Sequence, residues 1–212
     1  AEWSPPASTA GDFLAALETP FRYSAESEHS NQVVRVQASG KLISDDNGWT
    51  LGVFDTTPPR NKRLSLGRSF DIFDPNAPHH EAWYKNEHGK FAVTWNSTLA
   101  DGVTHNFYQL VISEAAQDEG MGNGNNVCFC YGDMQWGPGK VGVHSSGAND
   151  RAHVDFFGGT YENGNVDTLD HKTCCFNADK LKALGPNADF ASLCHSRGTE
   201  AGSSGDPHFK TW

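Results

Sequence analysis

The stretch KFAVTWN at residues 90–96 decides the fold of this chain, and two more follow it: NFYQLVIS at residues 106–113 and CFCYGDMQW at residues 128–136. In the first stretch, Phe91 and Trp95 fall on the same face of an extended chain. Because successive side chains of a β-strand point to opposite faces, this alternation predicts a strand with one buried face. The second stretch alternates in the same way, and turn-forming residues separate it from the third.

Short strands separated by turns continue on both sides. In QVVRVQA at residues 32–38, Val34 and Val36 share one face, and WTLGVF at residues 49–54 follows the turn Asp45–Gly48. The Asn-Gly pair of that turn readily takes the positive φ values of tight hairpins. This succession predicts a mainly β fold, an antiparallel β-sandwich or roll. Further strands are expected at residues 82–84 and 152–157.

Two short helices are expected at the ends of the chain. TAGDFLAALE at residues 9–18 has helix-forming composition, and ADKLKAL at residues 178–184 follows a capping Asn177 and stops at Gly185-Pro186. The predicted organisation is an irregular lead at residues 1–30, a β domain at residues 31–172, and a cysteine-containing helical segment with a Gly/Ser-rich linker at residues 173–203.

The composition argues against several classes of partner. The chain has 212 residues and a formal net charge of -10. Nucleic acid and anionic lipid both attract basic surfaces, so neither is an expected partner. No apolar stretch is long enough to span a bilayer, and membrane insertion is not expected. The opening AEWSPP is typical of a mature N-terminus left by signal-peptide removal, although a chain cut elsewhere would look the same.

All the cysteines lie in the second half of the chain. Two are adjacent and are expected to bond to separate partners, and two others, two positions apart, share one face of a strand. Two disulfides would leave one cysteine over, whose partner is expected outside this segment. Five reduced thiols in a cytosolic protein, or a zinc site, are the alternatives, although neither close pair has zinc-knuckle spacing. The disulfide candidates are Cys128, Cys130, Cys174, Cys175 and Cys194.

The order of the three stretches at residues 90–96, 106–112 and 128–136 resembles the NIDO domain, an extracellular module first described in nidogen. In that family a "vTW" strand precedes an "N-x-F-Q-L-v-L" strand and then a Y-x-D/N-x-x-W element, which the three stretches match in sequence. The resemblance covers residues 31–160. This chain departs from the family's pattern in the segment after Trp136 and in carrying Cys128 and Cys130.

The end of the chain, GDPHFKTW at residues 205–212, resembles the first strand of a von Willebrand factor type D domain. Residues 204–212 are therefore expected to open a further domain. In some relatives the Asp-Pro bond of this motif cleaves itself, which here is the bond between Asp206 and Pro207. This chain runs on to Trp212, so cleavage is not evident. Together the two resemblances imply a secreted, disulfide-containing, multidomain glycoprotein.

The remaining site candidates are a sequon and two oxygen-rich loops. Asn96-Ser97-Thr98 is an N-glycosylation sequon, expected near a surface turn. No cofactor is predicted, and calcium is the one ion for which the loops offer ligands. Turn formation explains both loops as well, and the histidines are expected in solvated loops. The calcium candidates are Asp45, Asp46 and Asn47 in one loop and Asp71, Asp74 and Asn76 in the other.

The sequence favours a non-catalytic extracellular structural or adhesion module that contacts other extracellular proteins or copies of itself. No nucleophile elbow, HExxH helix or phosphate loop is present, so an enzyme is not expected. A sugar-binding β-sandwich is the first alternative, since tryptophan faces stack on sugar rings; a secreted hydrolase is the second, with acidic residues in one loop. The residues concerned are Trp49, Trp83, Trp95 and Trp136 for sugar binding, and Glu114, Asp118 and Glu119 for hydrolysis.

Overall fold

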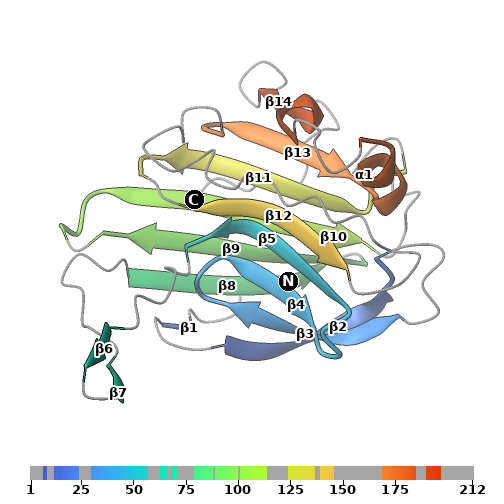
Figure 1. The fold of residues 1–212 in the computed structure, drawn as a ribbon. Coiled ribbons are helices and arrows are strands. Elements are labelled where there is room, and N and C mark those ends of the chain that lie inside the picture. Colours follow the sequence, from blue (N-terminus) through green and yellow to red (C-terminus); the bar gives the residue numbers. More distant parts are fainter. Residues whose placement is uncertain are drawn as a thin grey trace.

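Two antiparallel β-sheets lie one over the other and make up most of the structure (Figure 1). The prediction of a mainly β fold is confirmed. The computed structural model describes residues 7–8, 12–23, 30–56, 63–65, 68–70, 79–87, 89–99, 101–113, 124–136, 139–145, 169–184 and 190–196. The expected strand at residues 152–157, the linker and the GDPHFKTW ending lie outside these ranges.

The stretches KFAVTWN, NFYQLVIS and CFCYGDMQW form the centre of the larger sheet, as consecutive antiparallel neighbours. Trp95 lies opposite Tyr108, and Tyr108 opposite Tyr131. In spatial order the strands are β1 (Ala7–Ser8), β8 (His79–Glu87), β9 (Lys90–Thr98), β10 (His105–Ser113), β11 (Val127–Met134), β13 (Lys172–Phe176) and β14 (Cys194–Ser196).

The smaller sheet has five strands, and a short two-stranded sheet stands apart from it. The predicted turn at Asp45–Gly48 is confirmed, because Asn47 has φ 57° and its N–H donates to the Ser44 carbonyl at 3.0 Å. The order in the five-stranded sheet is β12 (Lys140–Ser145), β5 (Trp49–Asp55), β4 (Lys41–Ser44), β3 (Asn31–Gln37) and β2 (Asp12–Phe21), and the small sheet pairs β6 (Arg63–Ser65) with β7 (Arg68–Phe70).

The predicted N-terminal helix is wrong, because residues 12–21 form strand β2. Burial alternates along this strand: Ala15 and Leu17 are buried, whereas Leu14 is 65% exposed. Hydrogen bonding to β3 satisfies the backbone, and the alternating face closes one side of the core, so tertiary packing outweighs local helix propensity. The expectation of an irregular lead is wrong for these residues too.

An amide side chain caps the outer edge of β2. Asn86 on β8 donates from Nδ2 to the Ala16 carbonyl at 2.9 Å and accepts the Glu18 N–H at Oδ1, at 3.2 Å. One side chain thus replaces part of a missing neighbour strand, which reduces the exposed edge that could pair with another chain.

A β-bulge in β5 (Trp49–Asp55) joins the two sheets. The register of β5 shifts by one residue between Gly52 and Asp55, and both Val53 and Phe54 donate their N–H to the Gly40 carbonyl. Their own carbonyls turn inward and accept hydrogen bonds from phenols of the other sheet: Tyr131 donates to Val53, and Tyr108 to Phe54 at 3.3 Å.

Burial of the Tyr108 phenol raises its pKa above the usual range, so this hydroxyl keeps its proton as a donor. Trp95 Nε1 makes a third such link, to the Gln37 carbonyl at 2.8 Å. Its ring stacks on Tyr108, with centroids 5.4 Å apart. The centre of the sandwich is therefore held by packing and by polar links between the sheets.

The C-terminal helix lies where the sequence predicts it. Helix α1 (Ala178–Leu184) begins after Asn177, whose Oδ1 accepts the Lys180 N–H at 2.9 Å, a typical N-cap. Buried Leu181 anchors the helix to the core. A 3-10 turn, η2 (Phe190–Leu193), leads into β14.

Candidate functional site

Two disulfides brace one edge of the seven-stranded sheet. Strand β13 carries the adjacent Cys174 and Cys175, and their side chains point to opposite faces of the sheet. Cys175 bonds to Cys128 on β11, and Cys174 bonds to Cys194 on β14, each directly opposite its partner in the register. The prediction that the adjacent cysteines bond to separate partners is confirmed.

The fifth cysteine belongs to neither bridge. Cys130 is 2% exposed and packs with Val111 and Cys128 in a small second cluster, as expected for two cysteines sharing a face. The expectation of a disulfide partner outside this segment does not fit this position, because an outside thiol cannot reach a buried sulfur while the sheet is intact. Interior packing explains Cys130 instead.

The sequon and the first calcium loop have local explanations. Asn96 lies near the end of β9, just before the expected turn, in which the Gly102 N–H donates to the Leu99 carbonyl at 2.9 Å, and its side chain is partly exposed. In the loop, Asp45 Oδ1 accepts from Asn31 Nδ2 at 2.9 Å, and Asp46 Oδ1 accepts the Gly48 N–H at 2.9 Å. A side-chain hydrogen bond from Ser44, followed by the one from Gly48, lowers the pKa of Asp46. These contacts make a turn.

Asp71, Asp74 and Asn76 of the second calcium loop lie outside the described residues, as do Glu114, Asp118, Glu119, Asp206 and Pro207.

The tryptophans considered for sugar stacking are mostly interior. Trp49, Trp95 and Trp136 are buried, at 4%, 0% and 8% exposure, and only Trp83 of the four is partly exposed. Stacking on a sugar ring needs an accessible indole face, so the three buried rings cannot provide it.

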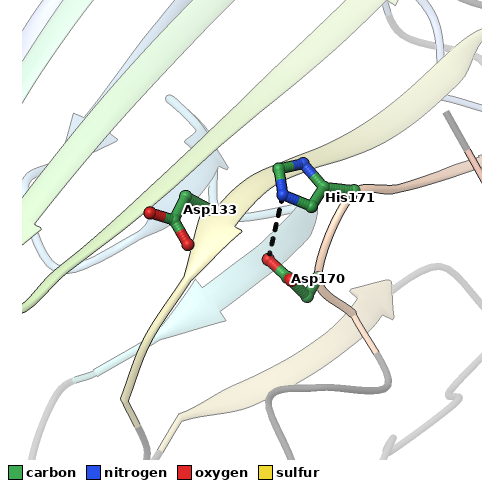
Figure 2. Close-up of side chains that lie close together, drawn as sticks. All are labelled: Asp133, Asp170 and His171. Atoms are coloured by element: carbon green, nitrogen blue, oxygen red, sulfur yellow. Dashed lines mark ion pairs between the residues drawn. The ribbon is translucent and has the colours of Figure 1, made fainter. Parts of the chain in front are cut away.

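A cluster that the sequence did not predict lies where β11 ends. Asp133 on β11 meets Asp170 and His171 of the turn before β13, and one ligand atom from each lies within 4.8 Å of the others (Figure 2). His171 Nε2 is 3.7 Å from Asp170 Oδ1. A fourth residue, His105 at the start of β10, places Nε2 3.1 Å from Asp133 Oδ2.

Backbone contacts fix this turn on β11. The His171 N–H donates to the Gly132 carbonyl at 3.0 Å, and Asp170 Oδ1 accepts the Met134 N–H at 2.9 Å. The turn is therefore hydrogen-bonded to β11 on both sides of Asp133. His171 takes a φ of 55°, and Leu169 just before the pair is buried in the core.

Oxygen and nitrogen donors of this kind are chemically able to bind a cation. Sequence reasoning missed Asp133 and Asp170 because they lie far apart in the chain and belong to no local ligand motif. The one available signal in the sequence is Asp133 itself, the acidic residue of the Y-x-D/N-x-x-W element, whereas the sequence predicts solvated loop positions for His105 and His171.

Among the described residues, no helix has the length and apolarity needed to cross a membrane. No family model matches this chain, and no curated protein and no solved structure is significantly similar to it. The NIDO and type D resemblances therefore remain predictions based on the quoted motifs.

Proposed function

We propose that this chain is a non-catalytic extracellular module of a larger secreted glycoprotein, which helps to assemble a matrix, cell coat or surface filament through contacts with other proteins or with copies of itself. The observation that carries the proposal is the pair of disulfides on β13. Disulfides form and persist in oxidising compartments and are rare in cytosolic proteins. Each bridge joins directly opposed cysteines of neighbouring strands, so bracing is its simplest role.

The architecture supports the same function. Most of the large side chains of the described core fill the space between two sheets, which gives a rigid body rather than a hollow one. The motif order that resembles the NIDO domain and the ending that resembles a type D domain point in the same direction. Asn96, partly exposed on β9, would carry a glycan on the outer face of the larger sheet.

The compartment is tested by mass spectrometry of the native protein. Non-reducing peptide mapping should recover the pairs Cys128–Cys175 and Cys174–Cys194 from the medium or the cell surface. Treatment with peptide N-glycosidase should reduce the mass of the wild type but not of Asn96→Gln. Recovery from the cytosol with all five cysteines reduced would overturn the proposal.

The adhesive role needs a separate measurement. Beads coated with the oxidised, secreted protein should aggregate, or should bind to surfaces coated with extracellular matrix. Beads coated with the same protein after reduction and alkylation are the matched control and should bind less. If oxidised and reduced beads both stay dispersed and bind no matrix, the adhesive function is wrong, even if the protein proves to be extracellular.

A further inference from the structure

We propose that Asp133, Asp170 and His171 bind one divalent zinc ion, which pins the turn before β13 to the end of β11. This site is independent of the proposed adhesive function. The two carboxylates and the imidazole come from two chain segments that the fold brings together, with one ligand atom of each within 4.8 Å of the others (Figure 2).

The carboxylates are positioned by contacts that leave each of them an oxygen for a metal. Asp133 Oδ2 accepts from Gln135 Nε2 at 2.8 Å and lies near His105 Nε2, while Asp170 Oδ1 accepts the Met134 N–H. Asp133 Oδ1 and Asp170 Oδ2 have no hydrogen-bond donor in the described part of the chain. Metal sites are commonly built this way, with outer hydrogen bonds that orient the ligand groups.

The charge balance of the cluster also favours a cation. Within the described ranges, the ion-pair partners of Asp133 and Asp170 are the imidazoles of His105 and His171, and no lysine or arginine pairs with either carboxylate. Lys172, the nearest cation in sequence, donates instead to Ser196 Oγ at 2.8 Å. Two carboxylates that lie close together without a lysine or arginine partner attract a cation.

The donor set selects the class of ion. Calcium and magnesium take oxygen ligands, whereas imidazole nitrogen suits zinc and its neighbours in the first transition series. The side chains of Asp133, Asp170 and His171 are 46%, 34% and 62% exposed, which leaves room for a water molecule as fourth ligand.

The geometry needs only a modest adjustment. Ligands of a tetrahedral zinc ion lie about 3.4 Å apart, and the ligand atoms here lie within 4.8 Å of one another, so no pair must close by more than about 1.4 Å. Rotation of partly exposed side chains can supply this movement.

The test is calorimetric titration of the purified, oxidised and tag-free chain with zinc chloride. One tight site is expected, together with a zinc-dependent rise in the unfolding midpoint. Asp133→Asn and His171→Asn should each weaken zinc binding by about 10-fold or more. Asparagine suits both positions, because it keeps a similar shape and tolerates the positive φ at His171.

The matched control is the double variant Asp179→Asn with His195→Asn, which removes an exposed carboxylate and an exposed imidazole elsewhere. It should bind zinc as the wild type does. The visible bands of tetrahedral cobalt should appear in the wild type and in this control but not in His171→Asn. Zinc binding that survives in Asp133→Asn and His171→Asn, its absence in the wild type, or one-to-one calcium binding in its place would each overturn the assignment.

Discussion

Individual residues at turns and strand ends make contacts that their neighbours cannot replace. Gly40 has φ 108°, and its carbonyl accepts two N–H groups from the bulge in β5. A Cβ at this position would lie 2.1 Å from the Phe54 carbonyl oxygen and 2.7 Å from the Tyr108 hydroxyl. The glycine therefore serves both the backbone conformation and the close approach of the bulge.

Gly40→Ala should lower the free energy of unfolding by about 3 kcal/mol or more, because the new methyl group collides with backbone and forces the bulge to move. Gly102→Ala is the matched control. Gly102 also has a positive φ, 71°, but a Cβ added there would meet no atom within 4 Å. Its cost should be about 1 kcal/mol, from backbone strain alone. Urea denaturation of the oxidised proteins measures both, and equal losses would contradict the argument.

Asn106 explains why the second and third stretches belong together. Its Oδ1 accepts the N–H groups of Gln135 and Trp136, at 2.8 and 3.0 Å, and its Nδ2 donates to the Trp136 carbonyl at 2.8 Å. The first residue of NFYQLVIS thus holds the last residue of CFCYGDMQW. The side chain of Asn106 is fully buried.

Asn106→Asp should cost about 3 kcal/mol, because it replaces a buried donor with an oxygen that faces a carbonyl. Asn86→Asp makes the same chemical change at the exposed edge of β2, where water can replace the lost bond, and should cost about 1 kcal/mol. Denaturation midpoints at neutral pH decide the comparison. A loss at Asn86 as large as the loss at Asn106 would show that burial is not the cause.

At the scale of elements, β13 is the strand in which both disulfides of the described residues meet. It has five residues, and two of them are bonded to the strands on either side. The bridges lie on opposite faces: Cys174 and Leu181 of α1 belong to the main core, whereas Cys128 packs with Cys130 and Val111 in the second cluster.

The two bridges should contribute unequally to stability. They close loops with sequence separations of 47 and 20 residues, so chain entropy predicts losses of about 4 kcal/mol for Cys128→Ser with Cys175→Ser and about 3 kcal/mol for Cys174→Ser with Cys194→Ser. Cys130→Ala leaves both bridges intact and should cost on the order of 1 kcal/mol. Denaturation of the three variants without reductant tests this order of stability losses. A larger loss for Cys130→Ala than for either bridge variant would contradict it.

At the scale of the whole molecule, the sandwich needs β2. Phe21 at the end of this strand is 1% exposed and packs edge-on against Trp49, with ring centroids 5.4 Å apart. Without β2, the edge of β3 and one end of the core would meet water. The domain boundary predicted at residue 31 remains a prediction. It would separate β2 from β3, although these two strands pair in one sheet.

A chain that begins at residue 31 should therefore aggregate or unfold without a cooperative transition. A chain that begins at residue 12 loses, of the described residues, those of β1 and should unfold close to the full-length midpoint. Circular dichroism during thermal unfolding, with size-exclusion chromatography, compares the two. Cooperative unfolding of the shorter chain at the full-length midpoint would show that β2 is dispensable.

The sequence predicts the parts of this fold that local patterns encode. The spacing of Phe91, Val93 and Trp95 at every second residue predicts a strand, because a strand's own side chains determine which of its two faces is buried. The composition of the segment containing Leu14 and Leu17 favours a helix, and it is the pairing with β3 that makes this segment a strand. The cluster of Asp133 and Asp170 is a property of the tertiary fold, so no window of sequence contains it.

The placement of Cys174 and Cys175 has a consequence for biosynthesis. If β13 slipped by one residue against β11, Cys128 and Cys175 would no longer lie opposite each other, and this bond could not close. Oxidation of this pair therefore records the alignment of the chain: the bond between Cys128 and Cys175 fixes β13 in its native register on β11.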